Sequence, residues 1–279
     1  MAADPKDDGA SAPISVTRHA LSALLNSPLA GMAPWILMAV ISGPGRFEAA
    51  AATAFVLSVF LIVATHRRGT SVKLLEVFDA VYFGVMAILA LFAAPGLLRW
   101  LEYWGGEMAN LALVLFALGS IIVRVPFTLQ YAREQTEEQY WHVPLFIHIN
   151  YVITWAWVLG FGISAAAGFY GDAVLHDPGN FWTGWIIQIG GTVFAAAFTE
   201  FYPDYATYRA AEKAGTAAGM PPKRFFHLFD WIPVFVLAIG ISGLVTDSLH
   251  TVTGVVLIVL GAIGMGGMNR LANRLDSPA

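Results

Sequence analysis

Residues 47–65 read FEAAAATAFVLSVFLIVAT, a stretch in which Glu48 carries the one charged side chain. A helix that crosses the hydrocarbon core of a membrane needs about 20 mainly apolar residues. Lipid offers no hydrogen bonds to the backbone, so a spanning segment must bond its own amide groups, as an α-helix does. The stretch therefore predicts a membrane-spanning helix.

The rest of the chain has the same character. Of its 279 residues, 57% are hydrophobic and 12% are charged, whereas soluble domains carry about 25% charged residues. The sequence therefore predicts an all-α, polytopic integral membrane helix bundle whose main partner is the lipid bilayer. Eight stretches qualify as spans: 28–44, 47–65, 74–94, 108–124, 144–168, 181–201, 229–246 and 251–269.

The basic residues predict the orientation of these spans. With eight spans and a cytoplasmic N-terminus, every Lys and Arg except Arg46 and Arg99 falls on the cytoplasmic side, as the positive-inside rule requires. We therefore expect a cell membrane protein with both termini in the cytoplasm. The expected parts are a tail at 1–26 with a short interfacial helix at 14–26, four spans within 27–124, a cytoplasmic loop at 125–143, four spans within 144–270 with a cytoplasmic loop at 202–228, and a tail at 271–279.

Two short stretches resemble each other. Residues 73–79 read KLLEVFD and residues 224–230 read RFFHLFD, each at the start of an apolar stretch. The match predicts a four-plus-four parallel internal repeat, with an axis along the membrane normal. The alternative is that apolar sequences match by chance, and the shared aspartate is what raises this match above that background.

Asp79 and Asp230 are the first candidate site residues. Each follows a basic residue by six positions, which places it about 9 Å along its helix at 1.5 Å per residue. Acids at such depth tend to mark function, here a proton-titrating or cation-coordinating pair. Alternatively, both stabilise helix N-termini in the headgroup zone, or Asp79 pairs with Arg124.

Further polar residues lie inside the predicted spans. His148, Asn150, Thr154 and Gln188 are candidates for binding a ligand or ion, although such groups more often bond across helices and fix their packing. Haem bound through His148 is disfavoured, because a second axial histidine at matching depth is missing and His227 lies nearer the membrane edge. The chain has no cysteine, and we expect no metal site.

Charged residues border the predicted cytoplasmic loops. They could line a polar vestibule, although charged runs are usually solvated. The candidates are Arg124, Arg133, Glu134, Glu200 and Asp204.

The sequence lacks familiar catalytic signatures. It has no phosphate loop, dinucleotide fingerprint, zinc-protease motif or serine-hydrolase signature, which weighs against an enzyme without excluding one. No basic run points to nucleic acid. We expect a small-solute or ion transporter or channel with a cytoplasm-facing polar cavity. The alternatives are a membrane-embedded enzyme acting on a lipid or isoprenoid, and a non-catalytic, oligomeric or haem-bearing subunit of a membrane complex.

Overall fold

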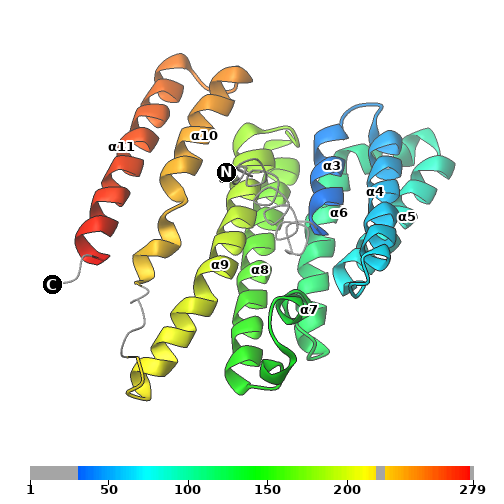
Figure 1. Ribbon diagram of the computed structural model, residues 1–279. Coiled ribbons are helices and arrows are strands. Elements are labelled where there is room, and N and C mark those ends of the chain that lie inside the picture. Colours follow the sequence, from blue (N-terminus) through cyan, green and yellow to red (C-terminus); the bar gives the residue numbers. More distant parts are fainter. Residues whose placement is uncertain (1–30, 218–223, 277–279) are drawn as a thin grey trace, which may run out of the picture. The chain divides into compact units, whose positions relative to one another are not determined.

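The computed structural model describes residues 31–217 and 224–276, and all regular structure within them is helical (Figure 1). The predicted N-terminal tail with its interfacial helix, and residues 277–279 of the C-terminal tail, lie outside these residues. The chain forms two compact units. The first comprises the described residues up to Ala94 together with Gln130–Glu137, and the second comprises Pro95–Leu129 and the described residues from Glu138 onward.

The first unit is built on three consecutive helices. They are α3 (Ala33–Ile41), α4 (Phe47–Arg67) and α5 (Leu74–Phe92), joined by most of α7 (Phe127–Glu134). Helix α4 packs against both α3 and α5. Gly45 adopts a left-handed conformation with φ of 69°, which glycine tolerates without steric cost. This permits the tight turn from α3 into α4.

The second unit contains the remaining elements. They are α6 (Pro95–Ile122), η1 (Glu138–Tyr140), α8 (Pro144–Phe169), the π-helical turns η2 (Tyr170–Leu175) and η3 (Phe181–Ile186), α9 (Ile187–Lys213), η4 (Phe225–Phe229), α10 (Ile232–Val245) and α11 (Thr251–Asp276). Helix α8 packs against α6 and α9, and α10 packs against α11 (Figure 1). A Cβ atom added to Gly160 would lie 2.5 Å from the carbonyl oxygen of Gly191, so small residues allow α8 and α9 to approach closely.

Seven described segments are long and apolar enough to cross a membrane, which suggests a multi-pass membrane protein. They are Phe47–Arg67, Leu74–Phe92, Pro95–Ile122, Pro144–Leu175, Phe181–Lys213, Phe225–Val245 and Thr251–Met268. Large apolar side chains such as Phe92 and Val245 remain exposed on these helices, as expected where the surrounding solvent is hydrocarbon.

The first of the eight predicted spans differs from the other seven. Its described part is α3, whose nine residues extend about 14 Å at 1.5 Å per residue, roughly half the thickness of the hydrocarbon core. Residues 28–30 lie outside the described part of the chain. The eighth crossing and the internal repeat therefore stay predictions, as do the division into halves and the cytoplasmic location of the two termini.

Several predicted boundaries differ from the helices observed. The span predicted at 108–124 belongs to α6, which starts at Pro95 and has 28 residues. Hydropathy excluded its first part because of Arg99, Glu102 and Glu107, but charged side chains do not break a helix. The loop predicted at 125–143 contains α7, whose Phe127, Thr128, Leu129 and Tyr131 are buried.

Candidate functional site

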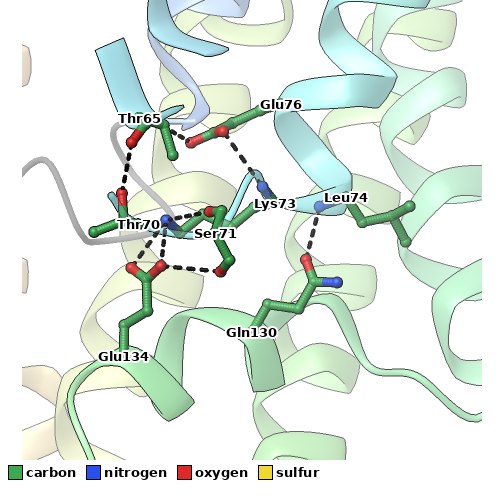
Figure 2. Close-up of polar contacts among 8 residues, drawn as sticks. All are labelled: Thr65, Thr70, Ser71, Lys73, Leu74, Glu76, Gln130 and Glu134. Carbon is green, nitrogen blue, oxygen red and sulfur yellow. Dashed lines mark hydrogen bonds and ion pairs between the residues drawn. The ribbon is translucent and has the colours of Figure 1, made fainter. Parts of the chain in front are cut away.

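The start of α5 is held by an acidic side chain. Lys73 directly precedes the helix, and its backbone N–H donates a hydrogen bond to Glu76 Oε2 at 3.3 Å. An acid at the third helical position often accepts a hydrogen bond from the backbone N–H of the residue before the helix. The other carboxylate oxygen of Glu76 accepts a hydrogen bond from Thr65 Oγ1 at 3.1 Å (Figure 2). Glu76 therefore ties the end of α4 to the start of α5.

A buried ion pair joins the same region to α7. Lys73 Nζ lies 2.9 Å from Glu134 Oε2, and the two side chains are 2% and 15% exposed. Ser71 Oγ also donates a hydrogen bond to Glu134, and the backbone N–H of Leu74 donates to Gln130 Oε1 at 2.7 Å (Figure 2). A buried charge pair of this kind holds its elements in register, because separating it leaves an uncompensated charge.

Asp79 lies one turn further along α5 and is 1% exposed. Its Oδ1 atom accepts a hydrogen bond from Trp35 Nε1 of α3 at 2.7 Å. The indole ring stacks on Tyr82 and lies against Phe83, with ring centroids 4.8 and 4.7 Å away. The partner of Asp79 is thus a neutral donor inside an aromatic cluster.

Tyr131 of α7 brings a hydroxyl group to the same region. Its side chain is 3% exposed, and its hydroxyl group has no hydrogen-bond partner among the described residues. Lys73 Nζ lies 5.6 Å from the centre of its ring. Burial, together with the negative charges of Glu76, Asp79 and Glu134, raises the pKa of the Tyr131 phenol well above its ordinary value. Tyr131 is therefore a neutral O–H group among acids.

These residues form what we call the acid cluster: Lys73, Glu76, Asp79, Tyr131 and Glu134. Its three carboxyl groups outnumber its one ammonium group. Such a set can bind a cation or exchange a proton. Within the described residues, no three His, Asp or Glu side chains are arranged so that they could hold a metal ion.

Gln188, predicted as a ligand-binding residue, belongs to a second polar group in the other unit. Its Oε1 accepts a hydrogen bond from Asn110 at 3.2 Å, and its Nε2 donates to the carbonyl oxygen of Thr183 at 2.9 Å. Asn110 also donates to the buried Glu107 at 3.5 Å. The amides thus link α6 to the η3–α9 segment, and ligand binding by Gln188 stays a prediction.

Asn150 and Thr154 are buried on α8, as their spacing on one face predicts. Thr154 Oγ1 lies 2.8 Å from Thr128 Oγ1, and Thr128 also bonds the carbonyl oxygen of Asn150. Asn150 donates to the carbonyl oxygen of Phe146. These contacts join α8 to the start of α7. His148 is exposed.

Asp230 has different surroundings from Asp79. It follows η4, its side chain is 48% exposed, and it pairs with His227 at 3.0 Å. The two aspartates that the repeat makes equivalent thus differ in burial and in partner.

The predicted vestibule residues belong to different parts of the chain. Glu134 pairs with Lys73 in the first unit, where Arg133 is half-buried beside it. Arg124 is exposed with φ of 61°, and Glu200 and Asp204 are exposed one turn apart on α9. Their convergence on one vestibule stays a prediction.

Sequence reasoning did not select three residues that act on Asp79 or interact with it, namely Trp35, Glu76 and Tyr131. For Glu76, a local signal existed, because it lies three residues before Asp79 and shares its helix face. For Trp35 and Tyr131 no local signal existed, since both come from distant segments.

Comparison with known proteins gives no relative: no protein-family model matches the chain, and neither the curated proteins nor the solved structures contain a match.

Proposed function

We propose that the protein is a multi-pass membrane transporter or channel for a small solute or ion, and that Asp79 lies at its ion-binding centre. The observation that carries this proposal is the complete burial of Asp79 within a helix able to span a membrane. Acids in such helices are costly and mostly belong to substrate pathways, ion pathways or proton relays.

The surroundings of Asp79 support a functional role over the headgroup alternative. An acid that only stabilises a helix N-terminus from the headgroup zone would be exposed to water or lipid headgroups. Asp79 instead bonds Trp35 of a different helix and lies near a second acid, Glu76. A buried arrangement of like charges is unfavourable for stability, which favours a role in function.

The proposed centre contains Asp79 and not Asp230. The carboxylate of Asp230 is half-exposed and already paired with His227. The proposal keeps the eight crossings, the cytoplasmic termini and the parallel repeat expected from the sequence, and the polar cavity open to the cytoplasm. No contact among the described residues favours the enzyme or the complex-subunit alternative.

Ion flux through the reconstituted full chain tests this proposal. Liposomes containing the protein are given gradients of H⁺, Na⁺ and K⁺ in turn, each read with an ion-sensitive dye. We expect flux of at least one ion above that of empty liposomes, and we expect Asp79→Asn to abolish it. Asparagine keeps the size of aspartate and an acceptor for Trp35.

Asp230→Asn is the matched control, since Asp230 occupies in residues 224–230 the position that Asp79 occupies in the similar stretch 73–79. It should leave the flux unchanged. A wild-type chain that moves none of the three ions, or an Asp79→Asn variant that transports as well as the wild type, would overturn the proposal.

A further inference from the structure

Glu107 is a second buried acid in a segment able to span a membrane, and the ion-binding centre proposed above does not include it. Its side chain is 5% exposed, and it lies near the middle of α6. A Cβ atom added to Gly168 of α8 would overlap Glu107 Oε2, so the absence of a side chain at Gly168 lets the carboxylate reach the backbone of α8. Burying a charged group costs free energy unless another group compensates the charge.

Asp172 belongs to the same helix interface as Glu107. Tyr103 lies one turn before Glu107 on the same face of α6, and its hydroxyl group donates a hydrogen bond of 2.8 Å to the carbonyl oxygen of Asp172. Gly168, which contacts Glu107, is four residues before Asp172 on the opposing segment. The side chain of Asp172 is 6% exposed. The two acids therefore lie in adjacent turns of one buried interface.

Neither acid has a counter-ion in the described part of the chain. No Lys, Arg or His side chain within residues 31–217 and 224–276 forms an ion pair with Glu107 or Asp172. The hydrogen bond that Asn110 donates to Glu107 is long, at 3.5 Å, and comes from a neutral amide. The interface thus holds two carboxyl groups without a described positive charge.

The hydroxyl group of Thr183 is a further oxygen at this interface. Thr183 is 7% exposed, and its Oγ1 atom has no hydrogen-bond partner among the described residues. It lies against the backbone of Gly171, because a Cβ atom added there would be 2.5 Å from Oγ1. Gly171 directly precedes Asp172 in the chain. An unpartnered, buried hydroxyl group therefore lies next to the acid pair.

A closed series of contacts connects the three segments that carry these groups. Asn110 donates to Gln188 at 3.2 Å, and Gln188 donates to the carbonyl oxygen of Thr183 at 2.9 Å. Together with the contacts above, these bonds join α6, the end of α8 with η2, and η3 with the start of α9. The turns η2 and η3 are π-helical, a form that is frequent at functional sites.

We propose that Glu107, Asp172 and Thr183, which we call the oxygen site, bind one alkali-metal cation. The three side chains offer only oxygen atoms, and such ligands suit hard cations. A divalent ion fits less well, because the described residues contain no group of three His, Asp or Glu side chains that could hold a metal ion. A proton on one acid would remove a charge but leave the Thr183 hydroxyl group unpartnered, whereas a metal cation contacts the carboxylates and the hydroxyl oxygen together.

The oxygen site lies in the second unit, whereas Asp79 lies in the first. Its test therefore uses the full chain with Asp79→Asn, so that ion binding at the first centre does not contribute. The purified chain in detergent is given radioactive Na⁺ and, separately, radioactive Rb⁺ as a substitute for K⁺. We expect saturable binding of at least one of them, displaced by the unlabelled ion and not by methylammonium.

Two substitutions locate this binding. Glu107→Gln should remove it, because the amide keeps the size of the side chain without its charge. Thr183→Val should weaken it about 10-fold, which is within the range by which supporting groups change metal affinity. Thr192→Val is the matched control, since the hydroxyl group of Thr192 on α9 already donates to the carbonyl oxygen of Gln188, and it should bind as the parent does.

Thermal unfolding distinguishes loss of the ligand from loss of the fold. A ligand that binds only the folded chain raises its Tm as the ligand concentration rises. The Tm of the Asp79→Asn chain should increase when the bound ion replaces choline at constant ionic strength, and the Tm with Glu107→Gln added should not. In choline alone, the Glu107→Gln chain should unfold at a higher temperature than its parent, because an uncompensated buried charge is gone.

Four results would overturn the oxygen site. They are an Asp79→Asn chain without saturable ion binding, binding that Glu107→Gln leaves unchanged, displacement by methylammonium, which would assign an organic cation, and a protonated carboxyl band in the infrared spectrum that Glu107→Gln removes from a chain that binds no cation, which would assign a proton. Ion flux is measured with Asp79 intact, so failure of the transporter proposal and failure of the oxygen site are distinguishable.

Discussion

Tyr131 carries a hydroxyl group that is buried and unpartnered within the described residues. Leaving a polar group in this state costs about 1–3 kcal/mol. Such groups are rare in folded proteins and call for an explanation.

Tyr131→Phe should therefore stabilise the fold at neutral pH, by about 1 kcal/mol. Its effect on alkaline stability follows from the raised pKa of the phenol. The unfolded chain loses the phenol proton above about pH 10, while the folded chain keeps it. The stability that depends on the neutral phenol is therefore complete below that pH, and it is lost as the pH rises towards the pKa of the folded state. Part of the alkaline loss of stability should disappear in Tyr131→Phe.

Thermal unfolding in detergent, followed by circular dichroism between neutral and alkaline pH, measures both effects. Tyr140→Phe is the control, because Tyr140 is half-exposed, and it should match the wild type at every pH. An alkaline loss that is the same in Tyr131→Phe and the wild type would contradict the assignment of the buried phenol.

At the scale of elements, α7 is held by the ion pair between Lys73 and Glu134. Removing one member of a buried pair leaves the other charge uncompensated, at a cost of about 3–5 kcal/mol. We expect Lys73→Met to lower the free energy of unfolding by an amount in this range, reduced because Glu134 is 15% exposed. Chemical unfolding in detergent measures this change.

The exposed pair of Arg209 and Glu212 on α9 is the matched control, with side chains 51% and 46% exposed. Exposed pairs contribute about 0–1 kcal/mol, so Arg209→Met should have little effect. Exchanging the charges, as in Lys73→Glu with Glu134→Lys, should recover part of the stability lost in each single variant. If Lys73→Met were as mild as Arg209→Met, the ion pair would not hold α7.

Elements were predictable where hydropathy alone defines them. The stretch at 47–65 became α4 with nearly the same limits, because nearly all of its residues after Glu48 are apolar. The start of α6 was missed, because hydropathy measures apolar character and not helix formation. The short helix α7 was also missed, because its burial depends on partners such as Asn150, Thr154 and Lys73 that come from distant segments of the chain.

At the scale of the whole molecule, the number of crossings decides on which side the N-terminus lies. The chain has no cysteine, so single introduced cysteines are unique labels. With eight crossings, Ser11→Cys and Ser277→Cys should both react with an impermeant thiol reagent only after the cells are opened. Ser248→Cys, in the predicted outer loop before α11, should react in intact cells.

The nine-residue length of α3 makes this measurement informative. If residues 28–44 entered the membrane and returned on the same side, the chain would cross seven times. Ser11→Cys would then react in intact cells while Ser277→Cys would not. That outcome would refute the eight-span topology without affecting the acid cluster, whose residues belong to α5, α7 and the loop before α5.

The sequence by itself determined that this chain is helical and suited to a membrane. Both properties are local, because a backbone in lipid must bond within its own segment and because apolar composition is summed over adjacent residues. It also identified Asp79 as an acid within a predicted membrane-spanning helix. Only the tertiary structure decided what meets Asp79: Trp35, 44 residues earlier in the chain, and Tyr131 from α7. Contacts between such distant segments depend on how whole helices pack, and no period or composition of a single stretch encodes them.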